Sequence, residues 1–159
     1  ILNRNKDIDI VSCPMIYFDS QGDWGQGTSI ERPKKEDFIK GTPFCHAPCM
    51  VRREAFEKVG GYSVGKRLLR VEDYHLWTKM YAKGLRGYNL QKPLYKMRDD
   101  RAAYKRRKYK YRVNEAYVRA YAIRNLGLPI YSWIFVLRPL VIGILPKGIY
   151  NYLHKKVRR

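Results

Sequence analysis

Acidic residues are scarce in this 159-residue chain, and its C-terminal part almost lacks them. Lysine and arginine total 33 against 14 aspartates and glutamates, which gives a formal net charge of +19. Residues 1–100 hold 18 basic and 13 acidic residues, whereas residues 101–159 hold 15 basic residues and one acid, Glu115. A mildly basic domain with a strongly basic tail attracts polyanions, either nucleic acid or the anionic face of a membrane.

Cysteine and long apolar runs are also in short supply. The cysteine count of three leaves at least one thiol unpaired, and no signal peptide is visible, so we expect a reducing cytosol. No run reaches about 18 uninterrupted apolar residues, so we expect no membrane-spanning helix. The chain begins with Ile1, in what reads as the approach to a strand, so we expect a fragment or a chain trimmed at its N-terminus.

Strand and helix patterns alternate over residues 1–98. Residues 7–19 are rich in Ile, Val and Tyr in alternation, which predicts a buried strand, and residues 20–27 read as a loop. The remaining patterns predict a short helix over 32–41, a strand leading into a helix over 42–62, a helix over 72–83 and two short strands over 87–98. This alternation favours an α/β layer arrangement.

The chain changes character after Asp100. Residues 101–128 predict a long helix with an apolar stripe made of Val113, Ala116, Tyr117, Ala120 and Tyr121. Taken alone, the mixture of Tyr, Lys and Arg at 101–112 suits nucleic-acid binding. The apolar segment that follows, with Tyr131, Trp133 and Arg138, suits helices lying in a bilayer interface, and its alternative is a helix packed on the protein's own core.

Two adjacent acids, Glu72 and Asp73, stand at the start of the predicted helix 72–83. From spacing alone the simpler explanation is electrostatic, because acids in a first turn complement the helix dipole. The functional alternative is that Asp73 is a general base that takes the proton of an attacking hydroxyl. Tyr74 and Trp77 follow at a helical spacing that suits a buried face, with sugar stacking as their alternative role.

His46 lies between Cys45 and Cys49, a pattern that invites comparison with a zinc site. A structural zinc ion needs four ligands, and His75 and His154 lie far away in the sequence. We therefore expect no metal site made by these residues.

Three segments carry a family resemblance in their order and spacing: "PFCHAPCMVRREAFEKVGGY" at 43–62, "VEDYHLWTKMYAKG" at 71–84 and "YNLQKPLYKMR" at 88–98. Together they resemble the second half of family 2 glycosyltransferases, the inverting enzymes of the GT-A fold. The resemblance covers about residues 7–100. The family's Asp-x-Asp motif and nucleotide-binding half have no counterpart in the chain, and the Gln/Arg-rich signature of processive members is also missing, which favours single-sugar transfer.

The resemblance implies an α/β fold, a partial GT-A (Rossmann-like) fold in residues 1–100. The composition of residues 101–159 predicts basic and amphipathic helices that follow it as a membrane-interface segment. The resemblance also implies that Asp73 is the base and that Glu72 orients it. It places His46 near the acceptor or the diphosphate, with a structural role at the strand end as the equal alternative. Arg98, at the end of a predicted strand, is a partner for the departing diphosphate or equally well a surface cation. Tyr74 and Trp77 are the further candidates for acceptor binding, by stacking on a sugar. A divalent cation, Mg or Mn, is expected to be bound mainly by residues absent from this chain.

The expected activity is transfer of a sugar from a nucleotide-sugar donor to a hydroxyl of a glycan or lipid-linked acceptor. The expected context is synthesis of a cell-surface polysaccharide or lipopolysaccharide, at the inner face of the plasma membrane, with an anionic membrane surface as partner and no nucleic acid. By itself the chain is expected to be inactive. The alternative from another class is a small basic nucleic-acid-binding module.

Overall fold

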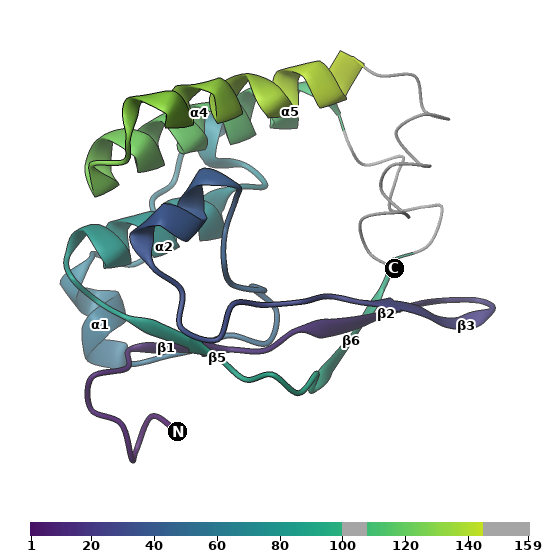
Figure 1. Cartoon of the computed structure of the whole chain (residues 1–159), viewed down its shortest axis with the longest axis vertical. Coiled ribbons are helices and arrows are strands. Elements are labelled where there is room, and N and C mark those ends of the chain that lie inside the picture. Colours follow the sequence, from purple (N-terminus) through teal and green to yellow (C-terminus); the bar gives the residue numbers. More distant parts are fainter. Residues whose placement is uncertain (100–107, 145–159) are drawn as a thin grey trace.

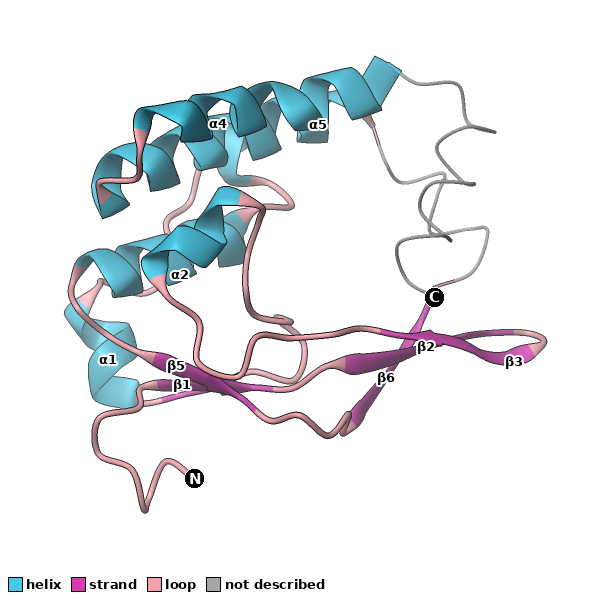
Figure 2. Ribbon diagram, in the orientation of Figure 1, coloured by secondary structure: helices cyan, strands magenta, loops and turns pink. Residues whose placement is uncertain are grey.

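Figure 1 shows the computed structural model of the chain, which describes residues 1–99 and 108–144. The strands form the lowest layer in this view, and helix α2 (Glu72–Ala82) lies above them. Helices α4 (Tyr109–Leu126) and α5 (Ile134–Ile144) run side by side as the outer layer (Figures 1 and 2). The mixed α/β layering expected from the sequence is therefore confirmed.

Two three-stranded sheets share one plan. The first has the order β4 (Met50–Val51), β1 (Ile10–Ser12), β5 (Gly87–Asn89), and the second has the order β3 (Gly22–Gln26), β2 (Met15–Asp19), β6 (Tyr95–Arg98). In each sheet the middle strand has an antiparallel neighbour on one side and a parallel neighbour on the other. Because β1 precedes β2 and β5 precedes β6 directly, the two parallel pairs form one interrupted ladder.

The single strand predicted over 7–19 is wrong, since it is two strands in two sheets. Cys13 and Pro14 separate them, and proline has no N–H to donate to a ladder. The loop predicted over 20–27 is also wrong, because β3 pairs with β2 through a tight turn at residues 20–21. The ring of Trp24 stacks on that of Tyr17 with centroids 5.4 Å apart, and this packing outweighs the loop-like composition.

The short helices connect the strands to α2. The helix predicted over 32–41 is the 3₁₀ helix η1 (Lys35–Ile39), and the predicted helices at 53–59 and 72–83 are confirmed as α1 (Arg53–Lys58) and α2. A second 3₁₀ turn, η2 (Lys66–Leu68), leads into α2. The core gathers apolar side chains of β1, η1 and α2, among them Ile10, Phe38, Leu76, Trp77 and Met80.

The apolar stripe predicted for the long helix is wrong in its choice of face. Val113 and Tyr117 are 48% and 41% exposed, and of the five predicted positions only Ala116 is buried. The buried face of α4 instead combines apolar with polar side chains: Asn114, Ala116, Val118, Arg119, Ala122, Ile123 and Leu126. Gly127, with a φ of 60°, ends α4 as expected. Residues 100–107 and 145–159, on which the rest of that helix and of the tail fall, lie outside the described residues.

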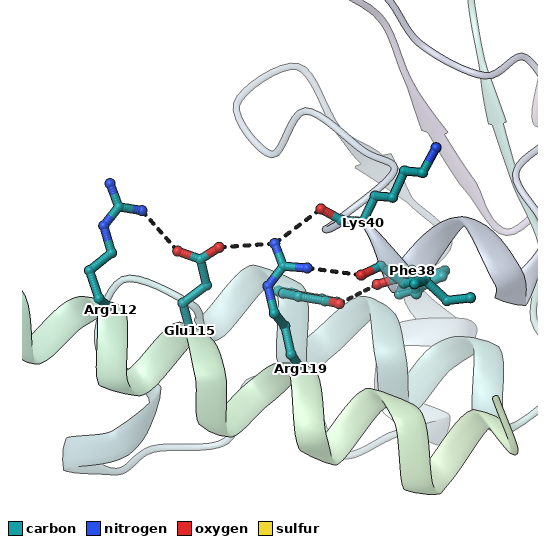
Figure 3. A network of polar contacts seen from close by, with 7 residues as sticks. Phe38, Lys40, Arg112, Glu115 and Arg119 are labelled. Atoms are coloured by element: carbon teal, nitrogen blue, oxygen red, sulfur yellow. Dashed lines mark hydrogen bonds and ion pairs between the residues drawn. The ribbon is translucent and has the colours of Figure 1, made fainter. Parts of the chain in front are cut away.

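A polar cluster explains why α4 buries this face. Arg119 donates from Nη1 to the Ile39 carbonyl at 2.9 Å and from Nη2 to the Lys40 carbonyl at 3.0 Å (Figure 3). Glu115 binds both Arg119 and Arg112 at 3.0 Å. From α2, the Tyr74 hydroxyl donates to the Phe38 carbonyl. We call Tyr74, Glu115, Arg119 and the η1 carbonyls the docking cluster, because it joins α4 and α2 to the end of η1.

Helix α5 follows the 3₁₀ helix η3 (Ile130–Trp133) and packs against α4. Its exposed side chains are the large apolar Ile134, Leu137, Val141 and Ile144, together with Arg138. Over residues 1–99 and 108–144, no helix has both the length and the apolar character that crossing a bilayer requires.

Candidate functional site

Glu72 and Asp73 form the first turn of α2, as the sequence predicts. Glu72 is exposed, whereas Asp73 is half-buried and its Oδ1 accepts a hydrogen bond from the Tyr74 N–H at 2.8 Å. The chain enters this helix through Arg70, whose φ of 71° is the one left-handed value among the described non-glycine residues. Strained backbone of this kind gathers near functional sites.

Three aromatic side chains from different segments lie beside Asp73. The His46 ring, from the loop before β4, is 6.0 Å from the rings of both Tyr62 and Trp77, measured between centroids. The Tyr62 hydroxyl is 3.4 Å from His46 Nε2. Electrostatic coupling joins Asp73 to both His46 and Tyr62. We call His46, Tyr62, Asp73 and Trp77 the site cluster.

The environment of Asp73 favours proton uptake. Burial raises the pKa of the Asp73 carboxyl above 3.8, and the neighbouring Glu72 adds to the rise, while the Tyr74 N–H and His46 oppose it. Burial, followed by the negative charge of Asp73, raises the pKa of the Tyr62 hydroxyl. A carboxylate with a raised pKa accepts a proton more readily, which suits a general base working near neutral pH.

Cys49 lies close enough to Asp73 for the two charges to interact, but it is chemically quiet. Burial raises the pKa of its thiol to about 12, and its Sγ–H donates to the Cys45 carbonyl at 3.1 Å. A neutral thiol is a poor nucleophile and a poor metal ligand. Across the described ranges, no three or more His, Cys, Asp or Glu side chains gather in a way that holds a metal ion.

Of the other predicted site residues, the structure brings Trp77 to the site cluster, whereas the Tyr74 side chain and Arg98 lie elsewhere. Trp77 joins the site cluster with its ring, but it is 1% exposed and also packs on Phe44 in the core, with centroids 5.8 Å apart. Tyr74 points to the docking cluster instead, where burial raises the pKa of its hydroxyl to about 12. Arg98 ends β6 in the second sheet with its guanidinium 5.4 Å from the Phe18 ring centre, and the contacts that make the site cluster do not include it.

Two residues with a place at this site were missed by sequence reasoning. Tyr62 follows Gly60 and Gly61 directly, and two glycines with φ values of 68° and 59° mark a loop of fixed shape. The glycine pair was visible in the sequence as the end of a helix, but the sequence did not show that the following loop returns to His46. Lys79 was missed because a lysine at this position of the predicted helix 72–83 looks like any solvent-facing polar residue. Its contacts are described below.

No protein-family model matches the chain. EpsE of Bacillus subtilis strain 168, named as a glycosyltransferase without a stated substrate, is 37% identical over 155 residues, which cover 98% of this chain and 56% of EpsE. An Escherichia coli protein named UDP-Gal:alpha-D-GlcNAc-diphosphoundecaprenol beta-1,3-galactosyltransferase is 29% identical over 165 residues, covering 99% of this chain and 58% of that protein. The chain spans a little over half the length of these relatives. Over nearly its whole length the chain is thus similar to proteins named as glycosyltransferases.

Proposed function

We propose that this chain carries the acceptor side of an inverting family 2 glycosyltransferase of the GT-A type. The observation that carries the proposal is the alignment of 98–99% of the chain with relatives named as glycosyltransferases. The E. coli relative's name gives a UDP-sugar donor and a diphosphoundecaprenol-linked acceptor. This supports a nucleotide-sugar donor and a glycan or lipid-linked acceptor here, in the synthesis of a cell-surface polysaccharide or lipopolysaccharide.

In the proposed reaction Asp73 is the base. The acceptor oxygen forms a bond to the anomeric carbon while the bond from that carbon to the diphosphate oxygen breaks. The hydroxyl proton passes to Asp73, and the electron pair of the broken bond leaves with the nucleoside diphosphate. His46 and Tyr62 border the carboxylate and contact the acceptor. A divalent cation, Mg or Mn, would supply positive charge to the leaving diphosphate when bound, and residues mainly outside this chain would hold it.

The test is a transfer assay on the full-length protein. UDP release is measured with UDP-galactose and an undecaprenyl-diphosphate-linked GlcNAc as the first pair, followed by other nucleotide sugars. Asp73→Asn keeps the shape and the acceptor oxygen for the Tyr74 N–H, and we expect a loss of about 10²–10⁴-fold. Asp23→Asn is the matched control, since Asp23 is exposed and bound to Lys96 in the second sheet. Transfer above half of wild type in Asp73→Asn overturns the assignment of the base.

We also propose that the outer helices dock the protein on an anionic membrane surface, at the inner face of the plasma membrane. Residues 108–144 contain six basic residues and one acid, and that acid, Glu115, is already bound to Arg112 and Arg119. On α5 and η3 most exposed side chains are apolar, with Ile134 at 69% and Ile130 at 86% exposure, and Arg138 is an exposed cation among them. Apolar side chains with surrounding cations are the composition of an interfacial helix.

Flotation of the full-length protein with vesicles of phosphatidylglycerol and phosphatidylcholine tests this surface. Leu137→Asp should reduce vesicle binding by about tenfold or more, because burying a leucine contributes about 1.5–3 kcal/mol. Leu94→Asp is the matched control, an exposed leucine between β5 and β6. If the wild-type protein stays unbound at low salt, the membrane proposal is wrong. Binding of duplex DNA or RNA with the same sensitivity to Leu137→Asp would favour the nucleic-acid alternative.

A further inference from the structure

Lys79 holds a loop that belongs to the site cluster. It lies six residues after Asp73 on α2, and its ammonium group donates to the Val59 carbonyl at 3.0 Å, the Gly61 carbonyl at 2.5 Å and Ser63 Oγ at 3.1 Å. A lysine has three donors, so these bonds use all of them. The side chain is half-buried, and burial lowers its pKa.

The loop has a single well-defined path. Gly60 and Gly61 both adopt left-handed φ values, and the Gly61 N–H donates to the Phe56 carbonyl at 3.0 Å. A Cβ at Gly61 would lie 2.8 Å from the Phe56 ring, which is too close for any other residue. The loop is therefore fixed by glycine geometry on the α1 side and by Lys79 on the α2 side.

Tyr62 is the residue that this arrangement positions. It lies between the two groups that Lys79 binds, Gly61 and Ser63, and its ring packs edge-on against Phe56 with centroids 5.6 Å apart. Its hydroxyl faces His46, and it remains 41% exposed. An exposed aromatic ring with a polar tip offers both a stacking face and a hydrogen bond to a sugar.

We propose that Lys79 is a positioning residue for the acceptor sugar, acting through the 59–63 loop to place Tyr62 beside His46 and Asp73. This inference rests on the proposed function. Helix α2 then carries the base, Asp73, at its first turn. Nearly two turns later it carries Lys79, whose ammonium group fixes the 59–63 loop on the opposite side of the site. Loss of the ammonium group should loosen that loop without moving Asp73.

A purely structural role is the alternative, because Val59 is the C-cap of α1 and a cation there satisfies terminal carbonyls. In that case Lys79→Met would lower the fraction of folded enzyme and leave the KM for the acceptor unchanged. The positioning role predicts a higher acceptor KM, an unchanged donor KM and rescue by Lys79→Arg, which restores a cationic donor.

Two measurements on the full-length protein test the proposal. Hydrogen exchange followed by mass spectrometry should show at least tenfold faster exchange over residues 60–63 in Lys79→Met, with α1 and α2 unchanged. In the UDP-release assay the acceptor KM should rise at least fivefold, with the donor KM within twofold of wild type. Lys83→Met is the matched control, since Lys83 is exposed at the end of the same helix.

The outcomes separate this proposal from the proposed function. Unchanged loop exchange in Lys79→Met overturns the inference whatever the enzyme does. Faster exchange with an unchanged acceptor KM overturns it as well, because the loop then has no part in acceptor binding. If the wild-type protein transfers no sugar from any donor tested, the proposed function fails and the positioning role fails with it, and the exchange result then describes the loop alone.

Discussion

Asp73 and Tyr74 are neighbours on α2, yet their side chains enter two polar clusters of opposite character. In the docking cluster the Tyr74 hydroxyl, both Nη atoms of Arg119 and both Glu115 oxygens have partners within the protein. Within the described residues, the side chains of the site cluster bind one another through a single long contact of 3.4 Å between Tyr62 and His46, and Asp73 Oδ1 accepts the backbone N–H of Tyr74. Paired polar groups stabilise the fold, whereas polar groups left without strong partners are available to a substrate.

The strongest way to break this comparison is to remove Arg119. Arg119→Met leaves the Ile39 and Lys40 carbonyls without their donor and takes one partner from Glu115. We expect the free energy of unfolding to fall by about 3 kcal/mol, measured by urea denaturation. Arg124→Met is the control, because Arg124 is exposed on the same helix. Equal effects of the two changes would show that the docking cluster does not hold α4 in place.

A pair of hydroxyl deletions sharpens the comparison. Tyr74→Phe removes the donor to the buried Phe38 carbonyl, so we expect a loss of about 1–2 kcal/mol in unfolding free energy. Tyr62→Phe removes an exposed hydroxyl and should cost less than about 0.5 kcal/mol. Transfer activity should respond in the reverse order, with the acceptor KM raised in Tyr62→Phe and unchanged in folded Tyr74→Phe.

Asp73→Asn should change stability in the opposite direction from Arg119→Met. Because burial raises the folded-state pKa of Asp73, the native protein binds its proton more tightly than the unfolded chain does. The native state therefore loses stability as the pH rises through 3.8 and up to the folded pKa, and the loss persists at neutral pH. We expect the variant to melt at the same temperature as wild type at pH 4 and slightly higher at pH 7. A lower melting temperature at pH 7 would contradict the assignment of a desolvated carboxylate.

The smallest expected effect concerns His75 of α2, whose ring is 4.4 Å from that of Tyr121 on α4, measured between centroids. Burial lowers the pKa of His75 below 6.5 and the charge of Lys79 lowers it further, so the unfolded chain takes up this proton first. Stability is therefore lost as the pH falls through 6.5 toward the folded value. In His75→Phe this loss should be smaller between pH 7.5 and pH 5, as measured by urea denaturation at each pH. An unchanged pH profile would show that other groups cause it.

Local signals in the sequence were enough for α1 and α2 and for the position of the acidic pair. Alternation and glycine stops predicted α1 and α2, and the acidic pair was correctly placed at the first turn of α2. The wrong predictions for β3 and for the buried face of α4 share one cause: local composition does not show which segments pair in the tertiary structure. The β3 strand forms because β2 and Trp24 provide partners, and α4 buries Arg119 because three carbonyl and carboxylate acceptors face it.

The same limit applies to the site. The family resemblance, and not the spacing, pointed to Asp73 as the base. Which aromatic side chains lie near Asp73 depends on which segments return to it in space. His46 and Trp77 were named in advance, Tyr62 was not, and Tyr74 was named although its hydroxyl faces η1. The helix positions of residues 73 and 74 do not by themselves predict that their side chains have different roles. Their partners differ because α4 packs on one side of α2 and the 59–63 loop packs on the other.

The interrupted parallel ladder has a consequence for folding during synthesis on the ribosome. Ile10 pairs with Gly87, and Arg86 donates its backbone N–H to the Asp9 side chain across 77 residues of chain. At a synthesis rate of about 5–20 residues per second, β1 is made roughly 4–15 s before its parallel partner. During that interval one edge of the growing sheet is open to other strands, including those of neighbouring nascent chains. Whether Ile10 and Val11 stay unpaired with other strands therefore depends on how soon β5 is synthesised, as well as on the stability of the finished sheet.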